Sequence, residues 1–175
     1  INIEYKNPPR SSYLGSNFTV LSQKDMTELA KYVTIFYEEF NKYPQDFIKN
    51  VDLREVAFVK NLSDERLYIA AEPDYINEVL FYDIYHLNEN EVYQREVVHH
   101  EFYHMITQHV PDYTLHHDEV WESWNEPGFA YGKGMGSNQK NAVNPFAPSR
   151  LGFMTEYAMK AVEEDKAEVY ACLFV

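Results

Sequence analysis

The segment Arg95–Ile106, REVVHHEFYHMI, decides the expected chemistry of this chain and much of its expected fold. It contains the pattern His-Glu-x-x-His, which begins at His100 and ends at His104. Side chains four residues apart on a helix lie one turn above one another, with Cβ atoms about 5–6 Å apart, so both imidazoles can bind one zinc ion. The Glu101 carboxylate lies beside them and can reach a water at the metal without being a ligand itself, which suits a general base.

The residues around this pattern favour a helix with one apolar side. Asn88 followed by Glu91 is a helix-capping signal, and Pro111 stops a helix after Val110. A helix over residues 88–110 separates the His-Glu-x-x-His residues from an apolar stripe of Val98, Phe102 and Met105. Such a helix can pack against a core and carry a metal site at the same time.

The neighbouring histidines do not complete the site. His99 lies about 100° around the helix from His100, so we expect it to be a surface residue or to support a ligand rather than to be one. The histidine pair at 116–117 is also excluded by spacing. The longer metal-binding pattern requires a glycine and a third histidine where Thr107 and Val110 stand.

A third ligand must therefore come from elsewhere, and the segment EEDKAE beginning at Glu163 offers carboxylates. Glu164 and Glu168 share one face of a helix. Glu164 could bind zinc while Glu168 accepts the outer N–H of a ligand histidine. Glu163 is an alternative within this segment. Glu126 is a rival elsewhere, although Pro127 would interrupt a helix at that point.

Composition excludes several classes of function. The 175 residues are 45% hydrophobic and 25% charged, which is typical of one globular domain, residues 1–175. The net charge of −13 argues against nucleic acid as a partner, because phosphate binding needs clustered Lys and Arg. The single cysteine, Cys172, excludes an internal disulfide, and no apolar run is long enough for a membrane span. The chain is expected to be part of a longer protein.

The N-terminal part, residues 1 to about 110, is expected to form a small sheet with a backing helix. From Ser22, with Asp25 in a capping-box position, apolar residues recur at helical spacing as far as Tyr43, before Pro44. Residues 1–20 are expected to be an extended or loop lead-in. Three β-rich runs follow the helix, at Val56–Val59, Leu67–Ala71 and Val79–Tyr85.

The C-terminal subdomain, residues from about 111 to 175, is expected to close a cleft over the zinc-binding helix. Residues 111–153 have little periodicity and are expected to form a long loop at this cleft. A final helix should begin near Ala161 and continue past Val175. The fold class is α+β, with a small mixed or antiparallel sheet.

The sequence resembles the gluzincin-type metallopeptidases, in particular the group of anthrax lethal factor catalytic domains, clostridial Pro-Pro endopeptidases and zinc-binding metallopeptidases of secreted bacterial proteins and lipoproteins. Besides the His-Glu-x-x-His pattern, the likeness rests on a segment like Tyr-(x)6-Glu-Asp-x-Ala-Glu, in which Tyr157 stands seven residues before Glu164. It covers roughly residues 90–175. Lys166 replaces a large apolar residue that is usual there, which leaves the specificity open.

This resemblance implies a zincin-like fold and one Zn²⁺ per chain, bound by His100, His104 and Glu164, with Glu168 orienting a ligand histidine. It also implies that Tyr157 donates its O–H to the oxyanion of the reaction. In such enzymes a strand before the zinc helix presents its edge to an extended peptide, and the segment 78–85 is the candidate here. A secreted or extracytoplasmic location rests on the same analogy.

We therefore predict a zinc metalloendopeptidase that acts on a protein or peptide substrate, with Glu101 as the general base and Tyr157 as the oxyanion donor. One alternative is a degenerate peptidase that binds a protein or glycan through an aromatic loop of Trp121, Trp124, Phe129 and Tyr131. The intact Glu101 speaks against that alternative. Another alternative is a zinc hydrolase that acts on a non-peptide amide.

Overall fold

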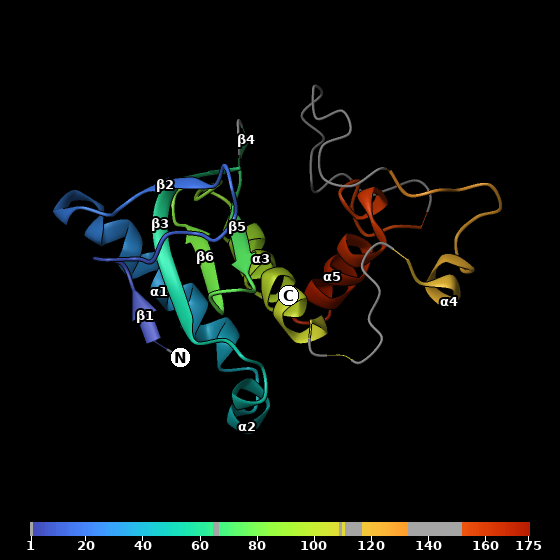
Figure 1. Cartoon of the computed structure of the whole chain (residues 1–175), viewed down its shortest axis with the longest axis horizontal. Coiled ribbons are helices and arrows are strands. Elements are labelled where there is room, and N and C mark those ends of the chain that lie inside the picture. The colour runs from blue at the N-terminus through green and yellow to red at the C-terminus, as the bar shows by residue number, and fades with distance from the viewer. Residues whose placement is uncertain (1, 65–66, 109, 111–116, 133–151) are drawn as a thin grey trace.

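A mixed sheet flanked by helices organises the molecule (Figure 1). The computed structural model describes residues 2–64, 67–108, 110, 117–132 and 152–175. The main sheet has the strand order β1-β3-β6-β5, formed by β1 (Asn2–Glu4), β3 (Glu55–Asp64), β6 (Val79–Asp83) and β5 (Ala71–Asp74). The first three strands are parallel, and β5 is antiparallel to β6. The expected α+β class with a mixed sheet is confirmed.

The segment expected to present a sheet edge is instead a central strand. β6 pairs with β3 on one side and β5 on the other, and all five of its residues are buried. Its apolar run is continuous because both of its faces are covered. The strand at the β6 end of the sheet is β5, which carries Pro73, a residue that edge strands tolerate because its missing N–H is not needed for pairing.

The N-terminal residues, expected to be an extended or loop lead-in, include two short strands. β1 extends the sheet, and β2 (Asn17–Thr19) pairs with the distal half of β3, which also pairs with β4 (Leu67–Tyr68). Between β1 and β2 the chain is bonded to β5: Ser11 donates to Glu72 at 2.5 Å, and Ser12 donates to Asp74 at 2.6 Å. These bonds hold the N-terminal segment against the edge strand.

The backing helix is present and begins as expected. Ser22 and Asp25 form the capping box, followed by a 3₁₀ turn at Gln23–Asp25 and by α1 (Met26–Phe40). The helix ends at Phe40 rather than at Tyr43. A second short helix, α2 (Gln45–Lys49), begins directly after Pro44 and was not predicted.

The central helix α3 spans Glu91–Thr107. Its cap is Asn90, whose side chain accepts a hydrogen bond from Tyr93 N at 3.1 Å, and not Asn88 as expected. The predicted apolar stripe of Val98, Phe102 and Met105 is buried against α1 and the sheet. The other side of α3 is therefore available for the polar residues of the motif.

The C-terminal part consists of α4 (Glu119–Glu122), a 3₁₀ turn at Ala158–Lys160 and α5 (Val162–Cys172), which packs against α3. Buried Ala167 and Ala171 allow the two helices to approach closely. The last helix begins near Ala161 as predicted but ends at Cys172, with Leu173 as its C-cap. Most of the expected 111–153 loop lies outside the described residues, and its described part contains α4.

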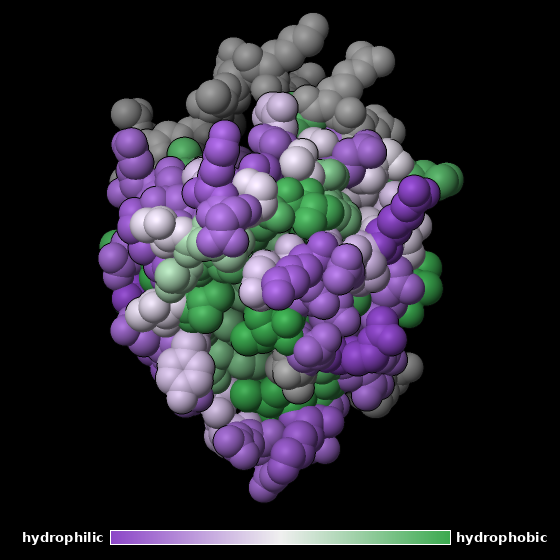
Figure 2. All heavy atoms as spheres, turned by 90° about the vertical axis from the view of Figure 1, so that its left-hand side faces the viewer, coloured by the Kyte–Doolittle hydropathy of each residue, from purple (hydrophilic) through white to green (hydrophobic). Residues whose placement is uncertain are grey.

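Two apolar layers cover the faces of the sheet. The larger layer joins the sheet to α1 and α3, and the smaller one, on the opposite face, contains Val59, Leu62 and Phe81. Figure 2 shows the side of the molecule away from α5, where hydrophobic residues form a broken band among hydrophilic ones. Within the described ranges, no helix combines the length and the apolar character that a membrane crossing requires.

Candidate metal centre

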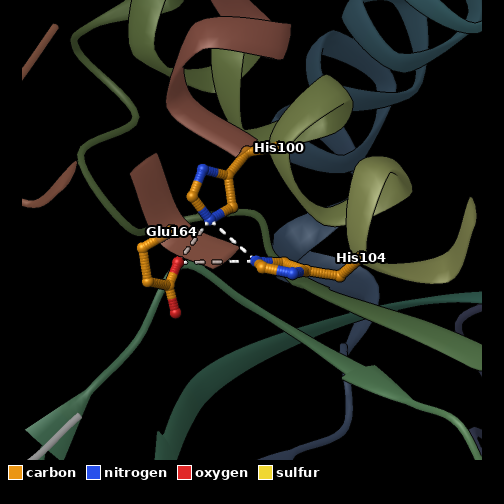
Figure 3. Close-up of side chains that lie close together, drawn as sticks. All are labelled: His100, His104 and Glu164. Atoms are coloured by element: carbon orange, nitrogen blue, oxygen red, sulfur yellow. Dashed lines mark hydrogen bonds and ion pairs between the residues drawn. The ribbon is translucent and has the colours of Figure 1, made fainter. Parts of the chain in front are cut away.

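Three side chains from two helices meet at one point (Figure 3). His100 and His104 project from adjacent turns of α3, and Glu164 projects from the first turn of α5. Nε2 of His100 lies 3.0 Å from Oε2 of Glu164 and 3.2 Å from Nε2 of His104. Nε2 of His104 lies 3.4 Å from the same carboxylate oxygen. All three residues are buried.

These separations fit a tetrahedral metal ion. Ligand atoms about 2.0–2.2 Å from a zinc ion at tetrahedral angles are about 3.3–3.5 Å apart. The three observed distances, between 3.0 and 3.4 Å, lie at or slightly below that value. Two imidazoles and one carboxylate are also a donor set that zinc accepts, with a fourth position left for water or substrate. The residues present therefore could hold a zinc ion.

The outer nitrogen of His100 is bound by Glu168, one turn after Glu164 on α5. Nδ1 of His100 lies 2.7 Å from Oε1 of Glu168. The other oxygen of this carboxylate accepts a hydrogen bond from Thr155 at 2.7 Å. A proton held on Nδ1 leaves the lone pair of Nε2 free for a metal. Thr155 was not found from the sequence, because nothing in its surroundings marks it as a partner of Glu168.

The pKa values of His100 and Glu164 shift in opposite directions, as expected for a positive and a negative group that bind each other. Burial lowers the pKa of His100, but its bonds to Glu164 and Glu168 outweigh burial and raise that pKa well above the ordinary histidine value. For Glu164, burial raises the pKa, and the two histidines outweigh it and lower the pKa far below the ordinary value. The carboxylate is thus charged at neutral pH, as a metal ligand must be.

Glu101 lies on α3 between the two histidines in sequence and is partly buried. Burial raises its pKa, and the neighbouring His100 and His104 act in the opposite direction. A carboxylate with a raised pKa binds a proton more tightly than an exposed one, which suits proton transfer near neutral pH.

Tyr157 lies over the same cluster, immediately before the 3₁₀ turn that leads to α5. Its ring centroid is 5.8 Å from that of His100, with the planes 61° apart, and the Lys160 ammonium lies 4.1 Å from the tyrosine ring centroid. Burial and the negative charges of Glu164, Glu101 and Glu168 raise the pKa of Tyr157 well above its ordinary value. The phenol therefore keeps its proton at neutral pH.

The other candidate residues are not among the three described residues that could hold a metal. His99 is outside the group that could hold a metal, as expected. It is completely buried and bonded to Glu39 and Tyr43, so the expectation of a surface residue is wrong. Among the described residues, the group that could hold a metal includes neither Glu163 nor Glu126. Glu126 instead lines a pocket of about 410 Å³.

The aromatic residues considered as a binding loop are partly fixed within the protein. Trp121 Nε1 and the Tyr131 hydroxyl both donate to Oδ2 of Asp165, at 2.7 and 2.6 Å. Phe129 packs on Phe153 with ring centroids 4.6 Å apart. The segment 117–132 is thus attached to α5 directly beside Glu164.

An α+β fold in which two crossing helices bring two imidazoles and one carboxylate together is an arrangement suited to a metal-dependent hydrolase. Comparison with families of known proteins is consistent with this class. The chain belongs to the family described as "Putative zinc-binding metallo-peptidase", whose model matches residues 1–175. Comparisons with curated proteins and with solved structures gave no match.

Proposed function

We propose that this protein is a zinc-dependent endopeptidase in which His100, His104 and Glu164 hold one zinc ion. The observation that carries the proposal is the approach of their three ligand atoms to within 3.0–3.4 Å of one another in a buried position. When bound, zinc lowers the pKa of water to roughly 7 and polarises a carbonyl group. Glu168 keeps the imidazole of His100 oriented toward the metal position.

Glu101 acts as the general base in this proposal. It accepts a proton from the attacking water and delivers it to the nitrogen of the leaving amine as the peptide bond breaks. Its raised pKa supports this role because the proton must be held between the two steps. Proton transfer by a positioned side chain contributes about 10²–10⁴-fold to a rate.

Tyr157 supplies a hydrogen bond to the negative oxygen that develops on the substrate carbonyl. Its proximity to His100 and the upward shift of its pKa support this role, since a donor must stay protonated throughout the reaction. A donor placed at the developing charge contributes most in the transition state, where the charge is largest.

The substrate lies as an extended strand along the edge of β5 that pairs with no other strand among the described residues. Asp83 N donates to Ala70 O at 2.8 Å, so these two residues form a hydrogen-bonded pair. Hydrogen-bonded and non-hydrogen-bonded pairs alternate along an antiparallel ladder. The backbone groups of Glu72 and Asp74 therefore point toward β6. Ala71 and Pro73 consequently turn their backbone groups away from β6. An added peptide strand can bond to the N–H and C=O of Ala71 and to the C=O of Pro73.

The rival function, binding of a protein or glycan through the aromatic residues, receives less support. The polar ends of Trp121 and Tyr131 are occupied by Asp165. An aromatic binding surface usually leaves such groups free for the ligand. Trp124 is exposed, but a single exposed ring is a small surface.

Incubation of a peptide library with the zinc-loaded protein, followed by mass spectrometry, tests the proposal. We expect internal cleavage that a chelator abolishes and that Glu101→Gln lacks. Release of single terminal residues would favour an exopeptidase. Retention of intact peptides or glycans without any cleavage would move the binding function to first place.

A further inference from the structure

His99 connects three helices behind the metal centre. It lies one residue before His100, is fully buried and points to a different side of α3. Its Nε2 atom lies 2.8 Å from Oε2 of Glu39 on α1, and its Nδ1 atom lies 2.6 Å from the hydroxyl of Tyr43. Its ring stacks on Phe174, which follows α5, with centroids 4.5 Å apart and planes 18° apart.

The partners of His99 are themselves held in place. Glu39, which is 1% exposed, pairs with Arg95 of α3 and with Lys42. The Lys42 ammonium also donates to the backbone oxygen of Phe174 at 2.9 Å. A buried carboxylate is stable only with such partners, so these contacts favour one geometry over others.

Glu164 and Glu168 bond α5 to His100 of α3, whereas two of the buried apolar residues of α5 are small. Buried Ala167 and Ala171 let α5 lie close to α3, but their methyl groups are too small to interlock with the facing helix. Glu164 is ten residues before Phe174, a distance of about 15 Å at 1.5 Å per helical residue. A rotation of only about 4° around the Phe174 end would move Glu164 by about 1 Å.

We propose that His99, Glu39, Tyr43 and Phe174 form a positioning device, here called the His99 latch, that sets the angle of α5 across α3. This inference rests on the proposed zinc site, because the residue positioned is Glu164. Metal–ligand distances tolerate changes of only about 0.2 Å, so a loosened α5 lowers zinc affinity although no latch residue touches the metal.

Zinc affinity, measured by competition with a chelator, tests the latch in four variants. His99→Leu removes both hydrogen bonds, Phe174→Ala removes the stacked ring, and His99→Gln keeps the ability to bond to Glu39. Val59→Ala is the matched control, because it removes buried volume on the opposite face of the sheet. Urea midpoints and circular dichroism establish that each variant is folded under the conditions of titration.

We expect the zinc dissociation constant to rise about 10–100-fold in His99→Leu and in Phe174→Ala, and less in His99→Gln. Val59→Ala should lose stability but keep wild-type affinity. If His99→Leu does not fold, Phe174→Ala carries the test, since Phe174 is only partly buried.

Two results would overturn the latch while leaving the proposed function intact. One is wild-type zinc affinity in both His99→Leu and Phe174→Ala. The other is an equal loss of affinity in Val59→Ala at equal loss of stability, because affinity would then follow overall stability. Failure of the wild-type protein itself to bind zinc would instead reject the proposed function, and the latch with it.

Discussion

Glu168 lies 2.7 Å from Nδ1 of His100, while Glu164, one turn earlier on the same helix, lies 3.0 Å from Nε2 of that ring. One helix therefore contacts both nitrogens of a single imidazole, one through a candidate ligand and the other through a supporting carboxylate. This relationship fixes the orientation of the ring.

Glu168→Gln should weaken zinc binding about 10–100-fold, the usual effect of changing a group that supports a ligand. The carbonyl oxygen of glutamine can still accept a hydrogen bond from the Nδ1–H group of His100. Glu168→Ala removes this acceptor and should weaken zinc binding further. Chelator competition measures both variants. Glu156→Gln, a partly buried carboxylate outside the cluster, is the control, and equal effects at the two positions would contradict the assigned role.

Glu101→Gln should lower the rate of peptide hydrolysis by about 10²–10⁴-fold and leave the zinc content unchanged, because the amide cannot accept the proton. Steady-state kinetics and metal analysis on the same preparation check both parts. Glu96→Gln is a suitable control from the same helix, since its pKa is also raised by burial. Retention of wild-type activity in Glu101→Gln would exclude Glu101 as the base.

Tyr157→Phe should lower kcat by about 10²–10³-fold, the effect of removing one donor to an oxyanion, with little change in KM. The ring remains, so its contact with His100 and zinc binding should persist. Tyr37→Phe, at an exposed position, should leave the kinetics unchanged. A rise in KM at constant kcat would indicate that Tyr157 binds substrate without acting in the transition state.

Asp165→Ala should release the segment 117–132 from α5, because Trp121 and Tyr131 both lose their acceptor. The two tryptophans of the chain, Trp121 and Trp124, lie in this segment, so intrinsic fluorescence reports on it directly. We expect a red shift of the emission and faster amide exchange in this segment. Glu119→Ala, which changes an exposed carboxylate there, should give neither effect.

Asp25, in the capping box before α1, should make part of the free energy of unfolding depend on pH in the acidic range. Bonds from Lys60, Ser22 and Tyr85 hold the pKa of Asp25 well below its ordinary value. Because the folded-state pKa is depressed, the stabilisation is present above the unfolded value of about 4 and is lost as the pH falls below it. Urea midpoints should therefore decrease less between pH 6 and pH 3 in Asp25→Asn than in the wild type.

The sequence predicted those elements whose signals are local. Helical spacing and the Ser22–Asp25 capping box located α1, and the apolar stripe of Val98, Phe102 and Met105 oriented α3. The three-residue strands β1 and β2 were missed because pairing with β3, far away in sequence, stabilises them. The continuous apolar run of β6 could have indicated a central strand.

The same distinction applies to the candidate site. His100, Glu101 and His104 follow from their spacing on one helix, whereas Glu164 was chosen over Glu163 by resemblance to a known family. The contacts of His99 could not be foreseen, since Glu39 lies sixty residues away and the pattern around His99 resembles that of a helix surface. Thr155 was missed for a similar reason, because only the folded chain brings it to Glu168.

The most direct test of the account is the zinc content of the purified protein by elemental analysis, compared with those of Glu164→Ala, Glu163→Ala and Glu126→Ala. We predict one zinc per chain in the wild type and in Glu163→Ala and Glu126→Ala, and its loss in Glu164→Ala alone. Absence of zinc from the wild type, or its loss through Glu126 while Glu164→Ala retains it, would contradict the proposed metal centre.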